Sequence, residues 1–157
     1  MDNHAIAQVF DRIARLMEAN GDLTFKVHAY RRVAKEFSLL AEPLSRLAEE
    51  NRLRTVPGVG VEIEKKVREL LDTGSLNFYQ RLITVVPEGL LDLMELPGVS
   101  PKLAGRLWRE LGVTTTDSLA AALDSGQPLA GIGPATADAL SHALAAAGRP
   151  LRSAPSE

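Results

Sequence analysis

Backbone amides beside paired glycines are the groups in this chain best placed to do chemistry. Residues 56–67 read VPGVGVEIEKKV, a Gly-Val-Gly turn that continues at once into a helical pattern. Glycine reaches positive φ without steric cost, so the backbone can turn tightly here while Val59 inserts into a core. The amides of the turn and of the first helical turn then lack partners and point outward. Such donors, at the positive end of a helix dipole, suit an anion such as a phosphate.

The same pattern occurs twice more, which makes it an internal repeat. The second copy is residues 96–107 and the third is residues 129–140, each with an apolar residue inside the turn. The helix of the third copy carries no cation, and acidic residues lie nearby. We therefore expect the first two copies to bind phosphate, and the third to complete a core by pairing with the second. The turn residues expected at the phosphate are Gly58, Gly60, Gly98 and Ser100.

The distribution of charge favours an anionic partner more than its sum does. The formal net charge is −2, which on its own argues against a nucleic-acid partner. Residues 24–35 and 96–109 nevertheless contain several cations and no acid, whereas residues 110–148 contain no Lys or Arg. A basic face is therefore expected in the first two thirds of the chain. Its candidate phosphate contacts are Lys26, His28, Arg31, Lys35, Lys65, Lys102 and Arg106.

Apolar residues recur at helical spacing along most of the chain, and no long stretch alternates with a period of two, so we predict an all-α protein. Residues Phe25, Ala29, Val33 and Phe37 are expected to form the inner stripe of one helix. The predicted helices cover residues 3–20, from 23 onward, 43–50, 61–72, 76–86, 90–95, 101–111, 116–124 and 134–147.

Proline and glycine at residues 87–89 interrupt the helical pattern and mark a domain boundary. We predict two small helical domains built around the repeated hairpins, at residues 1–86 and 87–148, followed by a flexible tail at 149–157. The absence of cysteine excludes disulfides and thiolate metal sites, and the three histidines are too far apart to suggest a metal site. A polar N-terminus and the lack of a long apolar run favour a cytoplasmic, nucleoid-associated protein.

The repeated turn resembles the helix-hairpin-helix motif, whose families bind nucleic-acid backbone without reading sequence. A wider set of segments resembles the N-terminal portion of family X DNA polymerases, the DNA polymerase beta group. Those segments are residues 25–34, 56–60 followed by Lys65 and Lys66, 71–74 and 96–101, in the order and spacing of the family. The resemblance covers the chain to about Leu140. The resemblance implies binding to gapped or nicked DNA in base-excision or gap repair. The carboxylates of a polymerase palm have no counterpart in this sequence, so polymerase activity would need a further domain.

The resemblance also implies a deoxyribose phosphate lyase site. Lys66 matches the lysine whose amine forms a Schiff base with the ring-opened sugar before β-elimination. Tyr30 matches a tyrosine of that pocket, and Lys26 matches a ligand of the 5′-phosphate. Glu62 stands where the family has a second phosphate-binding lysine, and Phe78 stands where relatives have a polar or basic residue. Since Glu62 and Lys66 are four residues apart on one helix, we expect an ion pair and a weakened lyase.

The expected partner is DNA with gaps, nicks or 5′-phosphate ends, together with other repair proteins. The resemblance implies that backbone carbonyls of the hairpins can hold a monovalent cation, K⁺ or Na⁺, with no other cofactor required. Those carbonyls belong to Arg54, Val56, Val59, Met94, Leu96 and Val99. The net acidity leaves a second hypothesis open, a non-catalytic helix-hairpin-helix scaffold that binds another protein through residues 114–147.

Overall fold

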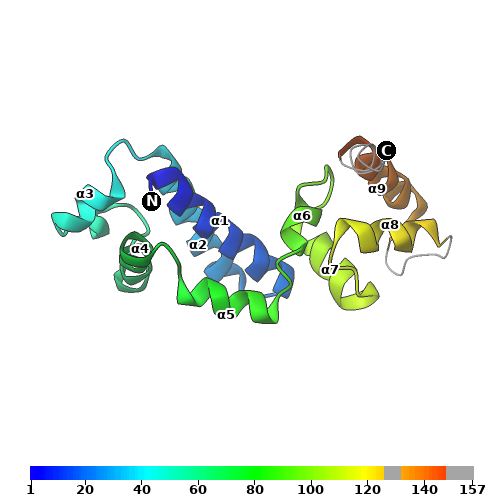
Figure 1. The fold of residues 1–157 in the computed structure, drawn as a ribbon, viewed down its shortest axis with the longest axis horizontal. Coiled ribbons are helices and arrows are strands. Elements are labelled where there is room, and N and C mark those ends of the chain that lie inside the picture. The colour runs from blue at the N-terminus through cyan, green and yellow to red at the C-terminus, as the bar shows by residue number, and fades with distance from the viewer. Residues whose placement is uncertain (126–131, 148–157) are drawn as a thin grey trace. The chain divides into compact units, whose positions relative to one another are not determined.

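A computed structural model describes residues 1–125 and 132–147 of the chain (Figure 1). Every element in these two ranges is helical, which confirms the predicted all-α class. Residues 129–131, where the predicted third repeat begins, and the predicted tail at 149–157 lie outside the described residues. The elements are α1 (Asn3–Asn20), α2 (Thr24–Leu39), α3 (Leu44–Glu49), η1 (Leu53–Thr55), α4 (Val61–Thr73), α5 (Asn77–Val85), α6 (Leu90–Met94), α7 (Pro101–Leu111), α8 (Thr116–Asp124) and α9 (Pro134–Ala147).

Contacts between residues divide the described chain into two units. Unit 1 comprises Met1–Glu18 and Asp22–Val86, and unit 2 comprises Ala19–Gly21 and the described residues from Pro87 onward. The division therefore falls between Val86 and Pro87, apart from the end of α1. No described helix is both long enough and apolar enough to cross a bilayer.

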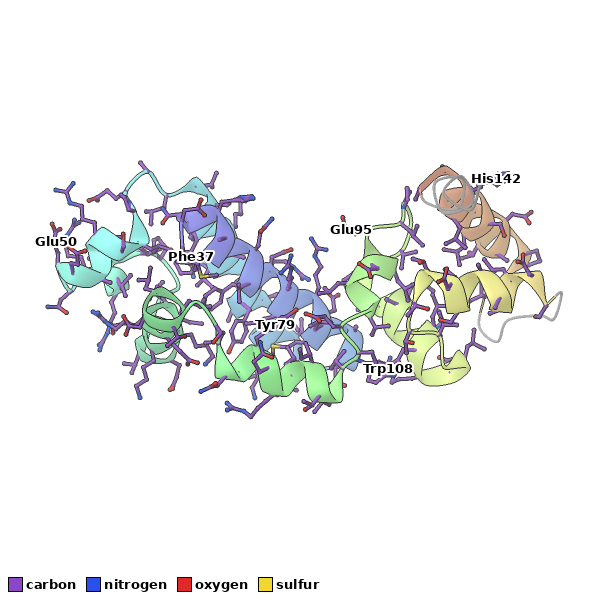
Figure 2. The ribbon with its side chains drawn as sticks, in the orientation of Figure 1. Phe37, Glu50, Tyr79, Glu95, Trp108 and His142 are labelled. Atoms are coloured by element: carbon purple, nitrogen blue, oxygen red, sulfur yellow. The ribbon has the colours of Figure 1, made fainter. Side chains whose placement is uncertain are left out.

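A row of aromatic rings runs from the core of unit 1 toward its surface. The Phe37 and Phe10 rings meet edge to face with centroids 5.5 Å apart, and both side chains are fully buried. Phe10 stacks on Tyr30 at 6.0 Å, and Tyr30 stacks on Phe78 at 5.7 Å. Figure 2 labels Phe37 inside the unit and Glu50 at its exposed edge. These contacts join α1, α2 and α5 around one core and bring Tyr30 within reach of solvent.

The inner stripe of α2 differs from the predicted one. Phe25 is 68% exposed and Ala29 is also exposed, whereas Val27 and Ala34 are buried beside the predicted Val33 and Phe37. In a helix of 3.6 residues per turn, each step of four residues rotates the side-chain direction by about 40° around the helix axis. Over the three steps from Phe25 to Phe37 the predicted stripe therefore rotates out of the core.

In unit 1 one helix is capped by a neighbouring side chain and another by a side chain far away in the sequence. The Asp2 carboxylate accepts a hydrogen bond from the Ala5 amide at 2.8 Å and caps α1. The Asn3 side chain donates to the Glu42 carbonyl at 2.8 Å and accepts from the Leu44 amide at 2.7 Å, so it caps α3. Asn3 thereby ties the start of α1 to the segment that leads into the first hairpin.

In unit 2 the second hairpin joins α6 to α7, and α8 contacts α9. Ser100 caps α7, and Thr115 caps α8 in a reciprocal pair with Ser118. Leu107, Leu119, Leu140 and Leu144 are among the buried side chains of this unit. The helix that follows the third turn thus contributes Leu140 and Leu144 to the buried residues of unit 2.

Candidate nucleic-acid interface

The first two hairpins adopt the same backbone turn. In the first, Pro57 precedes Gly58, whose φ is +88°, and the Val59 amide donates to the Val56 carbonyl at 3.1 Å. Proline followed by a residue with positive φ and closed by this hydrogen bond is a type II turn. The apolar residue inside the turn is buried, as the sequence predicts. Only the first glycine of the motif has positive φ, since Gly60 has φ −105°.

The second hairpin repeats this geometry at Pro97 and Gly98, where φ is +86°. The Val99 amide donates to the Leu96 carbonyl at 3.1 Å, and Val99 is 6% exposed against 7% for Val59. Two turns of one geometry therefore present two similar sets of amides, one in each unit.

The two hairpins differ at the start of the helix that follows. Gly60 gives α4 no side-chain cap, and the first helical hydrogen bond runs from the Glu64 amide to the Gly60 carbonyl at 2.9 Å. Within the described chain, the amides of the first turn of α4, residues 61–63, have no acceptor. The first hairpin therefore offers three helical amides to a ligand, at the positive end of the helix dipole.

At α7 the Ser100 hydroxyl accepts the Leu103 amide at 3.1 Å, and Pro101 has no amide to offer. Of the first three residues of α7, only Lys102 keeps an unpaired backbone donor in the described chain. The second hairpin is therefore the poorer anion site of the two, although its Lys102 side chain is exposed and unpaired among the described residues.

Arg32 lies beside the turn of the first hairpin. A Cβ on Gly58 would come within 3.1 Å of Val33 Cγ1, 3.4 Å of Arg32 Cδ and 3.6 Å of Arg32 Nε. The Arg32 side chain is exposed and has no partner among the described residues. A guanidinium next to outward-pointing amides suits a phosphate, because it supplies paired N–H donors and a positive charge.

Arg31, the residue that the sequence suggested, has a different role. Its guanidinium forms an ion pair with Glu18 at 2.7 Å and so joins α2 to α1. Nothing in the run of cations on α2 distinguishes Arg31 from Arg32. Arg32 precedes Val33, which packs against the turn at Gly58, and knowledge of that contact would have identified Arg32. The contact joins residues 25 positions apart, so the local sequence does not reveal it.

The other cations of α2 do not share one face. Lys26 and Lys35 are nine residues apart, which places them about 180° apart around the helix. Lys26 lies on the side of Tyr30, whereas His28 and Lys35 lie on the outward side with Arg32. The side chains of Lys26, His28 and Lys35 are all exposed. The basic run therefore presents two separate groups of charge.

Lys66 is held by aromatic rings and not by Glu62. Its Nζ lies 4.8 Å from the ring centre of Phe78 and 6.0 Å from that of Tyr30. No ion pair joins Lys66 to Glu62 in the described chain, so that prediction is wrong. Burial raises the pKa of the Tyr30 hydroxyl, and the negative charge of Glu62 raises it further. The Lys66 Nζ therefore lies over aromatic rings rather than beside a carboxylate.

The remaining predicted contacts vary in how available they are. Lys65 is exposed and has no partner among the described residues, whereas Arg106 forms an ion pair with Glu110 at 3.5 Å.

The carbonyls of Val56 and Leu96 each accept the hydrogen bond that closes their turn. The other four predicted cation ligands, the carbonyls of Arg54, Val59, Met94 and Val99, accept none from the described residues and keep their oxygens available. No group of three His, Asp or Glu side chains in the described ranges could hold a metal.

Comparison with known proteins agrees with this geometry. Residues 1–76 match the family model of a helix-hairpin-helix domain, and residues 90–145 match that of a SAM-like helix-hairpin-helix tandem. Over 151 residues the chain is 33% identical to the DNA polymerase/3′-5′ exonuclease PolX of Bacillus subtilis (strain 168). The match covers 95% of this chain and 26% of that protein, so the chain spans about a quarter of its relative's length. The chain therefore contains two helix-hairpin-helix domains and matches the N-terminal, DNA polymerase beta-like region of bacterial PolX.

Proposed function

We propose that the chain binds the sugar–phosphate backbone of gapped or nicked DNA in repair. The first hairpin would seat the 5′-phosphate on the downstream side of the gap, and the second would contact the backbone of the other strand. The observation that carries this proposal is the uncapped start of α4 beside the unpaired guanidinium of Arg32. Contacts from amides and cations to phosphate position a protein without reading bases, so binding would be independent of sequence.

Two features favour the first hairpin as the site of the terminal phosphate. It leaves three helical amides unpaired, whereas the second leaves one. Lys26 and Lys65, both exposed and unpaired among the described residues, belong to the same unit. A terminal phosphate carries more negative charge than a phosphodiester, so it gains more from each additional donor.

The proposal predicts that a 5′-phosphate at the gap strengthens binding. One gapped duplex is prepared with and without that phosphate, and both are titrated by fluorescence anisotropy. We expect the phosphorylated duplex to bind roughly tenfold more tightly, about 1.4 kcal/mol, since charged groups form hydrogen bonds worth about 1.5–3 kcal/mol. Equal affinities would remove the terminal-phosphate site, and no binding to either duplex would remove the proposed function.

The same titration tests the proposed monovalent cation. The available carbonyl oxygens of Arg54 and Val59 in the first hairpin, and of Met94 and Val99 in the second, support such a site. Replacing K⁺ by tetramethylammonium at equal ionic strength keeps the screening of charge constant while removing the coordinating ion. Weaker binding in tetramethylammonium supports the cation site, and equal binding contradicts it.

We propose that Lys66 contributes charge to this surface and that lyase activity is weak. Its contacts with Phe78 and Tyr30 support this assignment. Borohydride reduction on a duplex with a 5′-deoxyribose phosphate should therefore trap little covalent complex. Lys65→Ala, which removes the neighbouring exposed lysine, is the matched control for Lys66→Ala. Efficient trapping that is lost in Lys66→Ala and kept in Lys65→Ala would establish Lys66 as the nucleophile.

A non-catalytic protein-binding scaffold, with a partner surface around residues 114–147, is the second candidate function. The charged side chains of α8 and α9 are Asp117, Asp124 and Asp138, with no Lys or Arg. A scaffold would show no affinity for gapped DNA at about 0.1 M salt, where backbone contacts still hold a DNA-binding domain. The polymerase and exonuclease activities in the name of the Bacillus relative are not proposed for this segment, which matches about a quarter of it.

A further inference from the structure

Glu64 connects the two sides of the first hairpin. It lies on the first turn of α4, and its carboxylate accepts a hydrogen bond from Arg54 Nε at 2.8 Å. Arg54 belongs to η1, on the other side of the turn. The second carboxylate oxygen accepts from an Arg68 terminal nitrogen at 3.2 Å. The Glu64 side chain is 16% exposed, against 61% for Arg54. Glu64 thus forms ion pairs with residues before and after the turn.

Arg68 extends this connection. Its guanidinium also donates to the Asn51 side chain at 3.1 Å, and Asn51 has φ +54°, a left-handed conformation. The segment that enters the hairpin is therefore attached to α4 at two points. Asn51 is bound by Arg68, which pairs with Glu64, and Arg54 is bound by Glu64 itself. The hydrogen bond from Arg54 lowers the pKa of the Glu64 carboxyl, and that from Arg68 lowers it further. Glu64 is charged at neutral pH.

We propose that Glu64 is a positioning residue for phosphate binding by the first hairpin. The donors of this site belong to the backbone of the turn and of α4, which cannot adjust as a side chain does. Their affinity for a phosphate therefore depends on how firmly the turn is held against the helix, and preorganised donors lose less entropy on binding. This inference rests on the proposed function, because it requires that the hairpin binds DNA.

Under this proposal Arg54 and Arg68 bind Glu64 rather than DNA. Arg54 and Arg68 would then support the site without touching phosphate. If Arg54 instead contacted phosphate directly, its removal would reduce the dependence of DNA affinity on salt, as removal of any phosphate-binding cation does.

The test compares Glu64→Gln with Glu62→Gln in the full chain. Both variants remove one negative charge from the first turn of α4, which by itself strengthens binding to DNA. Glu62 is exposed and forms no ion pair with a described residue. On the 5′-phosphorylated gapped duplex we expect Glu62→Gln to bind at least as tightly as wild type. Glu64→Gln should bind roughly fivefold more weakly, about 1 kcal/mol, a usual value within a shared network.

Arg54→Gln measures the same contact from its other end. If Glu64 acts through Arg54, this variant should weaken binding by a similar factor, leave the salt dependence unchanged, and combine non-additively with Glu64→Gln. It also serves as the test if Glu64→Gln is unfolded at the assay temperature. Additive effects with a lower salt dependence in Arg54→Gln would overturn the inference, as would Glu64→Gln binding as tightly as Glu62→Gln. Failure of the wild type to bind would instead contradict the proposed function.

Discussion

Gly58→Ala should lower the free energy of unfolding of unit 1 by roughly 2–4 kcal/mol, through two separate costs. A residue with a Cβ at φ +88° adopts the left-handed region, at about 1–2 kcal/mol. The new Cβ would also lie 3.1 Å from Val33 Cγ1, a buried side chain that has little room to move. Urea denaturation followed by circular dichroism measures the loss.

Gly98→Ala separates the two costs. Gly98 occupies the same position of the same turn with φ +86°, but a Cβ there would meet no atom within 4 Å. We therefore expect unit 2 to lose only the backbone term, about 1–2 kcal/mol. If both substitutions have equal effects on their own units, the new Cβ at position 58 meets no costly contact with Val33. Unchanged stability of Gly58→Ala would contradict the turn geometry itself.

The sequence predicts the helices of this chain well because local residues set their ends. Pro101 begins α7 after a serine cap, and Gly112 ends it in a left-handed conformation with φ +70°. The predicted and observed bounds of α7 are the same. Prolines, glycines and capping side chains act within a few residues of the helix end, so they can be identified without knowledge of the tertiary structure.

The candidate site is less predictable because its contacts join residues far apart in the sequence. Arg31 pairs with Glu18 on a neighbouring helix, and Lys66 meets the ring of Phe78 rather than Glu62 one turn away. In the second case a favourable spacing within one helix predicts an ion pair, but a packed aromatic side chain lies closer. Spacing identifies which residues can meet, and packing decides which of them do.

The acidic net charge does not oppose the proposed DNA binding, because several acidic side chains already form ion pairs within the protein. Acidic side chains pair with arginines in the described chain, as Glu42 does with Arg52 at 2.8 Å and Asp11 with Arg15 at 2.7 Å. The lysines of α2, together with Lys65 and Lys102, form no such pairs among the described residues. A local surface can therefore be basic although the sum of charges is −2.

Arg32→Ala should weaken binding to the 5′-phosphorylated gapped duplex by roughly tenfold or more, since a charged hydrogen bond is worth about 1.5–3 kcal/mol. The slope of log affinity against log salt should fall by about one, as expected when one phosphate-binding cation is removed. Stability should change little, because the exposed Arg32 side chain has no partner among the described residues. The measurement is a salt titration of DNA affinity, with thermal unfolding in parallel.

Arg31→Ala is the matched control, since it removes the same charge from the adjacent position. Arg31 is paired with Glu18 at a partly exposed site, so its loss should change stability by about 0–1 kcal/mol and leave the salt slope unchanged. Equal losses of affinity in the two variants would mean that DNA responds only to the total charge of α2. A loss confined to Arg31→Ala would place the contact on the side of α2 that faces α1, away from the hairpin. Only a loss confined to Arg32→Ala supports a phosphate site shared by that guanidinium and the amides of α4.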